Sequence, residues 1–404
     1  MSTKHSWARV AFAMFAVGWG ANQFSPMLIV YRHELDLRAG AVAGLFAVYA
    51  ATLIPGLLAG GPASDRFGRR AVLLPLVVAS PLATLLLMIE PRSLLVIIIG
   101  RALAGLCSGV VFSSATAWVQ DLSAGSGMSA RRSALALTAG FGLGPFTAAM
   151  LAQWAPDPLV VPYIPHLVLG TVAAVVVWTV PDVRRPRLPV KRSSGTLRKA
   201  RFWLAVAPSA PFVFGAISIA LVVLPEEVTS ARSLSAGFAG LMTAAAFCAG
   251  VLVQPLARRM ETRLPFSANV AGQICTAVGA AIAIPAVADA DRGLAVLAAV
   301  FLGLAYSQNL VAGLQQSERL AGPGDRGAVI ACYYALAYIG FGAPYLIDAL
   351  NLAAGREGAF VIVGSVAVVI AIWTAAYGKL SRRGDGGQGV ADGGVVVQDA
   401  AAGH

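Results

Sequence analysis

Long stretches without acidic or basic residues are the feature that most constrains this chain of 404 residues. Only 12% of its residues are charged and 58% are hydrophobic, whereas soluble domains carry roughly a quarter charged residues. The buried fraction of a globular fold rises only slowly with chain length. A soluble fold of this length could not hide so much apolar surface, so we expect lipid to surround it.

The charge-free windows have the length of membrane-spanning helices, which need about 20 residues, and exceed the ~10 residues of barrel strands. We expect an all-α membrane protein of about twelve transmembrane helices, because only helices satisfy such backbones in lipid. The windows cover 10–31, 39–64, 71–89, 93–120, 133–156, 158–181, 202–225, 233–257, 264–288, 293–317, 327–347 and 358–378.

Six windows precede a basic connector and six follow it. We therefore predict an N-terminal six-helix bundle at 1–181, a cytoplasmic connector at 182–201, a C-terminal six-helix bundle at 202–380 and a disordered cytoplasmic tail at 381–404. The connector is rich in Pro, Arg and Lys. It is either a tether held near anionic headgroups or a regulatory site.

Most of the 30 Lys and Arg residues fall in alternate loops between the windows. By the positive-inside rule this asymmetry places both termini in the cytoplasm. We expect a multi-pass protein of the cytoplasmic (inner) membrane. The net charge of +11 would suggest nucleic acid as the partner of a soluble protein, but here the basic residues determine topology, and we expect no nucleic-acid partner.

Catalytic and metal-binding patterns are missing from the sequence. The four cysteines lie inside apolar windows without metal-ligand spacing, and the four histidines form no cluster. An enzyme would need a nucleophile with its base, or metal ligands. We expect no cofactor, no bound metal and no enzymatic activity, and a membrane receptor would need a larger extramembrane domain than the windows leave room for.

The loop after the second window carries the most specific motif, Gly61-Pro-Ala-Ser-Asp65-Arg66-Phe67-Gly68-Arg69-Arg70. With the six-plus-six plan, it resembles the signature loop of the major facilitator superfamily. The resemblance implies a charge network that holds one face of a transporter shut, with Asp65 near the start of the helix that begins near Gly327. We predict that Asp121 pairs with Arg69 or Arg70. The alternative is an ordinary basic loop.

Two glycines of this loop have separate expected roles. Gly61 should permit close approach of helices, and Gly68 a tight turn. The corresponding loop of the second half, 254–263, keeps basic residues, and Arg258 falls at the place of Asp65. We therefore expect this copy to lack the acid and both glycines, as in weak internal repeats of transporters.

Arg101 is the only charged residue inside a predicted window. A charge in the bilayer costs several kcal/mol, above ~2.5 on insertion scales, so it should face a polar interior. Arg101 with Gly105 resembles the family's motif of the fourth helix, and Gly105 with Gly109 forms a small-residue stripe. Its depth matches that of Asn22 in the first window, so we expect them to be neighbours. The alternative is a structural bond to backbone carbonyls.

The fifth window contains Gly140, Gly144 and Pro145, in a pattern that resembles a motif of drug/proton antiporters of the family, with alanines in place of the final glycines. A kink is expected there and at Pro344, which follows a similar Gly-rich segment. The alternative is a packing helix with a proline bend. In the first window Asn22 stands where several proton-coupled exporters place Asp, so proton coupling through this position is not expected.

Aromatic and amide residues of the windows suit a lipophilic or neutral substrate better than a multiply charged one. Each aromatic residue alone is as well explained by packing. His166 is either a proton site or a hydrogen-bonded structural histidine. The candidate substrate and coupling residues are Asn22, Gln23, Arg101, His166, Tyr306, Gln308, Asn309, Tyr334 and Tyr338.

The resemblance implies a monomeric secondary transporter that works by alternating access. We expect a small-molecule substrate and a coupling proton, with efflux of a lipophilic or drug-like compound. The alternative is import of a nutrient such as a sugar or another small polar metabolite, because Gln308 and Asn309 could bond its hydroxyls.

Overall fold

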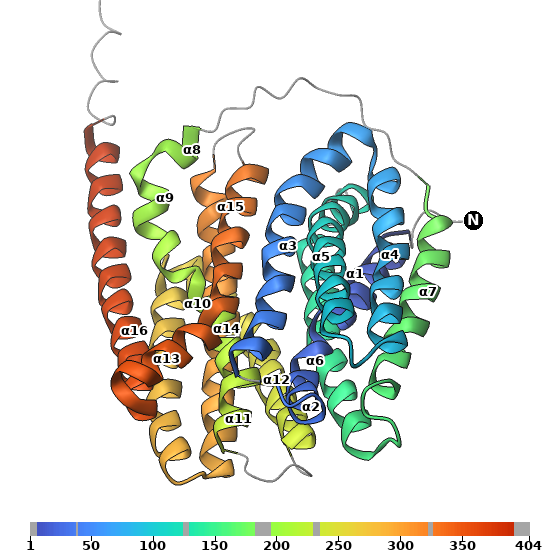
Figure 1. The fold of residues 1–404 in the computed structure, drawn as a ribbon. Coiled ribbons are helices and arrows are strands. Elements are labelled where there is room, and N and C mark those ends of the chain that lie inside the picture. Colours follow the sequence, from blue (N-terminus) through green and yellow to red (C-terminus); the bar gives the residue numbers. More distant parts are fainter. Residues whose placement is uncertain are drawn as a thin grey trace, which may run out of the picture.

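A computed structural model describes residues 6–37, 39–123, 129–181, 195–228, 235–321 and 326–391. Every regular element within these ranges is a helix. We call the elements before the connector the first group and those after it the second group, and Figure 1 shows α3–α7 on one side of the molecule and α9, α13 and α16 on the other. The all-helical prediction is confirmed for the described residues.

The first group begins with a broken helix and continues with long apolar helices. Its elements are α1 (Ser6–Asn22), α2 (Phe24–Glu34), α3 (Ala39–Phe67), α4 (Arg69–Ile89), α5 (Leu94–Leu122), α6 (Ser129–Trp154), η2 (Val161–Tyr163) and α7 (Ile164–Trp178). The predicted window 10–31 is therefore two helices. Pro26 has no N–H to donate to the carbonyl of Asn22, which explains a break at Gln23.

The second group begins with short helical pieces, where prolines again remove backbone donors. These are α8 (Gly195–Arg198), α9 (Ala200–Ala205), η3 (Ala207–Ser209), α10 (Pro211–Ser218), the π-helical turn η4 (Ile219–Val223) and α11 (Leu224–Val228). The long helices are α12 (Ser235–Arg263), α13 (Ser267–Ala288), α14 (Arg292–Leu320), α15 (Arg326–Ile339) and, after the 3-10 turn η5 (Gly340–Gly342), α16 (Ala343–Ala391).

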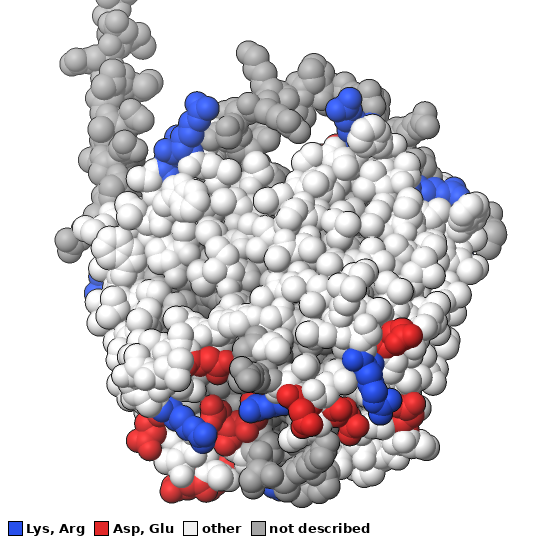
Figure 2. Space-filling view, in the orientation of Figure 1, with Lys and Arg blue, Asp and Glu red and all other residues white. Residues whose placement is uncertain are grey.

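Ten helices of the described residues are long and apolar enough to cross a membrane. One of them, Ala328–Leu380, has 53 residues and covers the predicted window 358–378 and all but the first residue of 327–347. Gly355 interrupts it with a φ of 77°, a left-handed conformation that glycine tolerates. The chain is a multi-pass membrane protein, and Figure 2 shows charged residues gathered at the two ends of the molecule with an almost uncharged middle.

Two predicted boundaries fall inside helices of the structure. The predicted disordered tail, 381–404, starts inside α16, which continues to Ala391 because neither proline nor a positive φ stops it after Gly355; residues 392–404 lie outside the described ranges. The predicted connector, 182–201, lies outside them up to residue 194, and α8 and the start of α9 occupy the remainder.

Close backbone contacts hold the first group together at predicted glycines. A Cβ atom at Gly105 or Gly109 of α5 would collide with carbonyl oxygens of α3, and one at Gly140 or Gly144 would collide with carbonyls of α1. The small residues thus let helices approach closely, as in other membrane proteins. α6 continues through Pro145 as one element, whereas the chain near Pro344 changes from α15 to η5 and then to α16.

Candidate functional site

The turn between α3 and α4 carries the predicted charge network. Arg69 Nε lies 3.0 Å from Asp121 Oδ2 at the end of α5, and Arg69 Nη1 lies 2.6 Å from Asp65 Oδ1. Arg69 Nη1 also donates to Ser64 Oγ at 2.6 Å. The predicted pairing of Asp121 with Arg69 is confirmed. Arg69 therefore joins the ends of α3 and α5 to the start of α4.

The other residues of this turn have separate roles. Gly68 has a φ of 103°, which confirms the tight turn. Gly61 is expected to permit close helix approach, but a Cβ there would meet no atom of the described residues within 4 Å, so for this part of the chain the prediction is wrong. The Arg66 guanidinium lies over Phe67, and that of Arg70 over Trp178 of α7.

The predicted placement of Asp65 near the helix at Gly327 stays a prediction. α15 begins at Arg326, and residues 322–325 before it lie outside the described ranges.

Arg101 is buried inside the first group, with 1% of its surface exposed. Its Nε donates to the carbonyl of Leu45 at 3.3 Å and its Nη1 to that of Ala21 at 3.5 Å. The guanidinium carbon lies 4.2 Å from the ring centre of Phe24 and 4.5 Å from that of Tyr49. Arg101 thus faces the protein interior and reaches the residue next to Asn22. Hydrogen bonds to backbone carbonyls are what a purely structural arginine would make. Nη2, however, has no partner among the described residues.

A second polar network surrounds the break between α1 and α2. Gln23 Nε2 donates to Thr84 Oγ1 at 3.4 Å, and Thr84 Oγ1 lies 2.6 Å from His166 Nδ1. Ser80 Oγ lies 3.4 Å from His166 Nε2, and the imidazole packs against Gly20. His166 therefore has hydrogen-bonding partners on both ring nitrogens, as expected for a structural histidine, and it links α7 to α4.

The buried amides of the second group bond to neighbouring side chains of the same group. Gln273 Nε2 donates to Asn309 Oδ1 at 3.1 Å, and Asn269 Nδ2 donates to Ser209 Oγ at 2.7 Å. Gln308 Nε2 lies 3.5 Å from Cys275 Sγ. Asn269 and Gln273 are buried and were not predicted as site residues, although their spacing of four residues places them on one face of α13. Asn269 Oδ1, Gln273 Oε1 and Asn309 Nδ2 have no partner within the described part of the chain.

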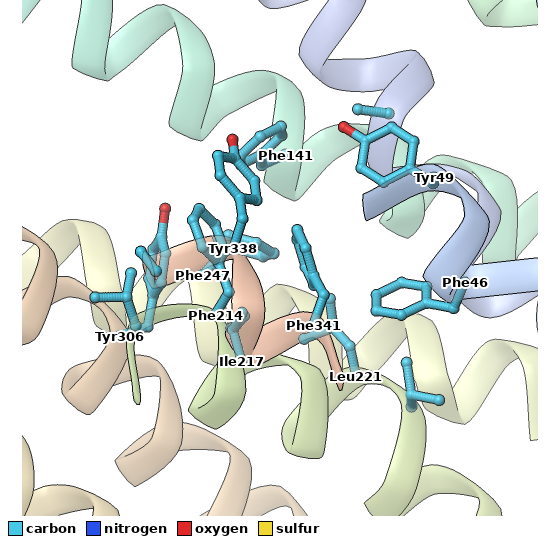
Figure 3. Close-up of a cluster of buried hydrophobic side chains, with 14 of the residues drawn as sticks. Phe46, Tyr49, Phe141, Phe214, Ile217, Leu221, Phe247, Tyr306, Tyr338 and Phe341 are labelled. Atoms are coloured by element: carbon cyan, nitrogen blue, oxygen red, sulfur yellow. The ribbon is translucent and has the colours of Figure 1, made fainter. Parts of the chain in front are cut away.

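Aromatic rings from both groups meet at Phe341 of η5 (Figure 3). Its ring centre lies 5.1 Å from that of Phe46 in the first group, and 4.8 Å from that of Phe214 in the second. Phe214 stacks on Tyr338 at 4.3 Å with an interplanar angle of 13°, and Tyr49 contacts Phe341 at 6.3 Å. We call Phe46, Tyr49, Phe214, Tyr306, Tyr338 and Phe341 the aromatic cluster.

The predicted tyrosines differ in their relation to this cluster. Tyr306 lies 5.9 Å from Phe214, and Tyr338 stacks within the cluster. Tyr334 lies at its edge, 6.4 Å from Tyr338. Of the three candidate tyrosines, Tyr338 contacts Phe341 directly, and Tyr306 joins the cluster through Phe214.

Glu261 of α12 is a buried acid that the sequence reasoning missed. Its carboxylate accepts hydrogen bonds from the N–H groups of Phe266 at 2.7 Å and of Ala268 at 3.2 Å, and from the Gln316 amide. The prediction that loop 254–263 lacks an acid is wrong. It rested on placing Arg258 opposite Asp65, whereas the helix ends place Glu261 there. Glu261 stands two residues before the end of α12, as Asp65 does in α3.

One ion pair joins the two groups at the ends of α2 and α11, and a second lies beside it within the second group. Figure 1 places these ends at the bottom of the molecule, away from α8, and we call this the opposite face. Arg32 of α2 forms an ion pair with Glu226 of α11. Glu227 pairs with Arg356 at 3.3 Å and accepts a hydrogen bond from Asn351 at 3.4 Å. Within the described ranges, no group of three His, Cys, Asp or Glu residues could hold a metal ion.

Known proteins show where this helical arrangement belongs. The sequence model described as Major Facilitator Superfamily matches residues 10–340. A crystal structure of a mutant of the nucleoside transporter NupG superimposes with a TM-score of 0.72 at 11% sequence identity, covering 93% of this chain and 100% of the other. No curated protein matches the sequence. At this identity the structural likeness shows the fold alone, but the sequence match covers most of the chain, which therefore belongs to the major facilitator superfamily of membrane transporters.

Proposed function

We propose that the chain spans the membrane twelve times as two six-helix halves, with both termini in the cytoplasm. The ten candidate spans support this count if α1 with α2 forms one further span and Gly355 divides the longest helix into two. Both amendments follow from backbone breaks at Gln23 and Gly355. The opposite face is then the outer face of the membrane.

The two groups contact each other toward this outer face. The contacts include the Arg32–Glu226 ion pair and the hydrogen bond from Gly237 N to Gln153 Oε1 at 3.1 Å. Gln153 stands one residue before the end of α6, and Gly237 lies near the start of α12. These contacts support an outward gate that is closed here and opens when the halves rock, as alternating access requires.

The proposed activity is proton-coupled efflux of a small lipophilic or drug-like compound. The observation that carries this proposal is the aromatic cluster, which joins the halves around Phe341 beside the buried Arg101. A site lined by aromatic rings with few polar groups favours an apolar ligand. The rings come from both halves, so rocking of the halves would expose them to each side in turn.

Import of a polar metabolite is the second candidate. Amide atoms of Asn269, Gln273 and Asn309 that have no partner among the described residues favour it, since a sugar or a nucleoside offers hydroxyls for such groups. The likeness to a nucleoside transporter is compatible with this candidate but is limited to the fold.

Accumulation assays in cells with and without the protein test both candidates. Efflux predicts lower accumulation of lipophilic compounds in cells that carry the protein, and a dependence on the imposed pH gradient. Phe341→Ala should abolish the difference, whereas Leu252→Ala, at an exposed position of α12, should leave it intact. Unchanged accumulation across a broad panel contradicts efflux, and thermal stabilisation by sugars or nucleosides alone would favour the importer.

A further inference from the structure

Among the described residues, the charge of Arg101 has no counterion. Its surroundings among the described residues are two carbonyls, the rings of Phe24 and Tyr49, and no carboxylate. A buried cation is costly unless it is paired and fully hydrogen-bonded. Carbonyl dipoles and ring faces stabilise the guanidinium only in part, and Nη2 is left without an acceptor. The missing partner is therefore an acceptor with negative charge.

The first helix offers no carboxylate to fill this place. Arg101 bonds to the carbonyl of Ala21, and the next residue is Asn22, whose amide carries no charge. The nearby hydroxyls of Tyr31 and Tyr163 bond to each other at 3.1 Å. The cluster around Arg101 is thus built to hold a positive charge without an acid of its own.

The aromatic cluster lies one ring away from Arg101. Tyr49 contacts the guanidinium on one side and Phe341 of the second group on the other. Phe46 packs edge-on against Phe341, in the same cluster. A ligand whose anionic group reached Arg101 Nη2 would place its body beside these rings, where a flat aromatic body packs best.

Resting on the proposed transport function, we propose that the substrate is an aromatic organic monoanion whose negative group pairs with Arg101. The substrate, and not a protein carboxylate, completes the charge balance of the site. A doubly charged ligand would leave one charge unpaired, and a neutral ligand would leave Arg101 as it is. Arg101 thus selects a substrate with one negative charge, and the aromatic cluster selects a substrate with an aromatic body.

The test measures ligand affinity of the full chain in lipid nanodiscs. The probes are benzoate, 2-naphthoate and indole-3-carboxylate, each compared with its neutral carboxamide. Wild-type protein should bind the carboxylates more tightly. Arg101→Gln should weaken carboxylate binding by on the order of 30-fold or more and leave the carboxamides nearly unchanged. Arg92→Gln, in the loop before α5 and exposed, should keep the preference of the wild type.

Asn22→Asp tests the same balance without removal of the arginine. A carboxylate one residue from the carbonyl that Arg101 bonds should compete with the ligand, so the preference for carboxylates should fall while the protein stays folded. Arg101→Lys keeps the charge and should retain part of the preference. Equal affinity for carboxylates and carboxamides, an unaltered preference in Arg101→Gln, or no carboxylate binding at all would each overturn the inference.

Proteoliposome flux separates this inference from the proposed function. Carboxylates that bind through Arg101 but are not transported would contradict the transport proposal and leave the charge assignment standing. Transport of neutral lipophilic compounds that is unaffected by carboxylates and by Arg101→Gln would support the transport proposal and contradict the charge assignment.

Discussion

The turn between α3 and α4 and the turn between α12 and α13 occupy corresponding places in the two groups but use their acids differently. Asp65 and Glu261 each stand two residues before the end of a helix of 29 residues. The Asp65 side chain is 66% exposed and pairs with Arg69, whereas Glu261 is fully buried and bonds to backbone N–H groups. Asp65 thus forms an ion pair near the surface, whereas Glu261 holds the backbone of its turn by hydrogen bonds.

The helices that end beside these two turns, α5 and α14, carry opposite charges at their second-to-last residues. Asp121 stands one residue before the end of α5, and Arg319 one residue before the end of α14. Asp121 pairs with the Arg69 side chain, while Arg319 donates to the backbone carbonyl of Glu261 at 3.0 Å. The second turn thus depends on main-chain bonds and the first on side-chain charges.

The two turns differ in how easily their bonds can be broken and remade. An ion pair near the surface contributes little, about 0–1 kcal/mol, and can be remade in another arrangement. A buried carboxylate that satisfies two backbone donors cannot leave without orphaning them. We infer that the first turn changes during transport and the second remains fixed.

The largest predicted effect belongs to Glu261. Glu261→Ala leaves the N–H groups of Phe266 and Ala268 without their acceptor, so the free energy of unfolding should fall by about 2–5 kcal/mol. Asp65→Ala should change it by less than about 0.5 kcal/mol, as expected for an exposed position. Thermal unfolding in detergent measures both. Equal losses of stability in the two variants would contradict the conclusion that the two acids have different structural roles.

The glycines of the first turn provide a smaller, signed test. Gly68→Ala forces a φ of 103° on a residue with a Cβ and should cost about 1–3 kcal/mol of stability. Gly61→Ala adds a methyl group inside a helix, where it meets no atom of the described residues, and should stabilise the protein by about 0.5–1 kcal/mol. The same unfolding measurement decides. A destabilised Gly61→Ala variant would show that Gly61 has the packing role first expected of it.

Charge-free windows predicted most of the fold because lipid leaves the backbone no alternative to helices. The break at Gln23 was not predicted, since an apolar window does not reveal where a missing backbone donor ends a helix. Pro26 carried a local signal of this break. Gly355 lies between the predicted windows 327–347 and 358–378, so the sequence predicted two spans there, but not that a positive φ in one residue would separate them.

The candidate site was predictable where a charge stands out and not where amides pair. Arg101 and Asp121 are conspicuous in the sequence because each is a charge at or inside an apolar window. Asn269 and Gln273 resemble ordinary polar residues until the packing of α13 on α14 places them together. Glu261 was missed because the two loops were aligned on basic residues, whereas the helix ends set their true correspondence.

The smallest predicted effect on stability concerns the pair of Arg69 and Asp121, yet it bears most directly on transport. Both side chains are partly buried, at 15% and 13% exposure, so a double-mutant cycle of Arg69→Ala and Asp121→Ala should give a coupling energy of about 1 kcal/mol. If the first turn switches during the cycle, each single variant should also slow flux in proteoliposomes, because the state that the pair stabilises is then less populated. The reversed pair, Arg69→Asp with Asp121→Arg, should restore part of that flux, and it provides a control against simple misfolding.

The matching variant in the second turn, Arg319→Gln, removes a donor to a carbonyl and should alter stability more than flux. If Arg319→Gln slowed flux as strongly as Asp121→Ala did, both turns would have to move, and the assignment of a fixed second turn would fail.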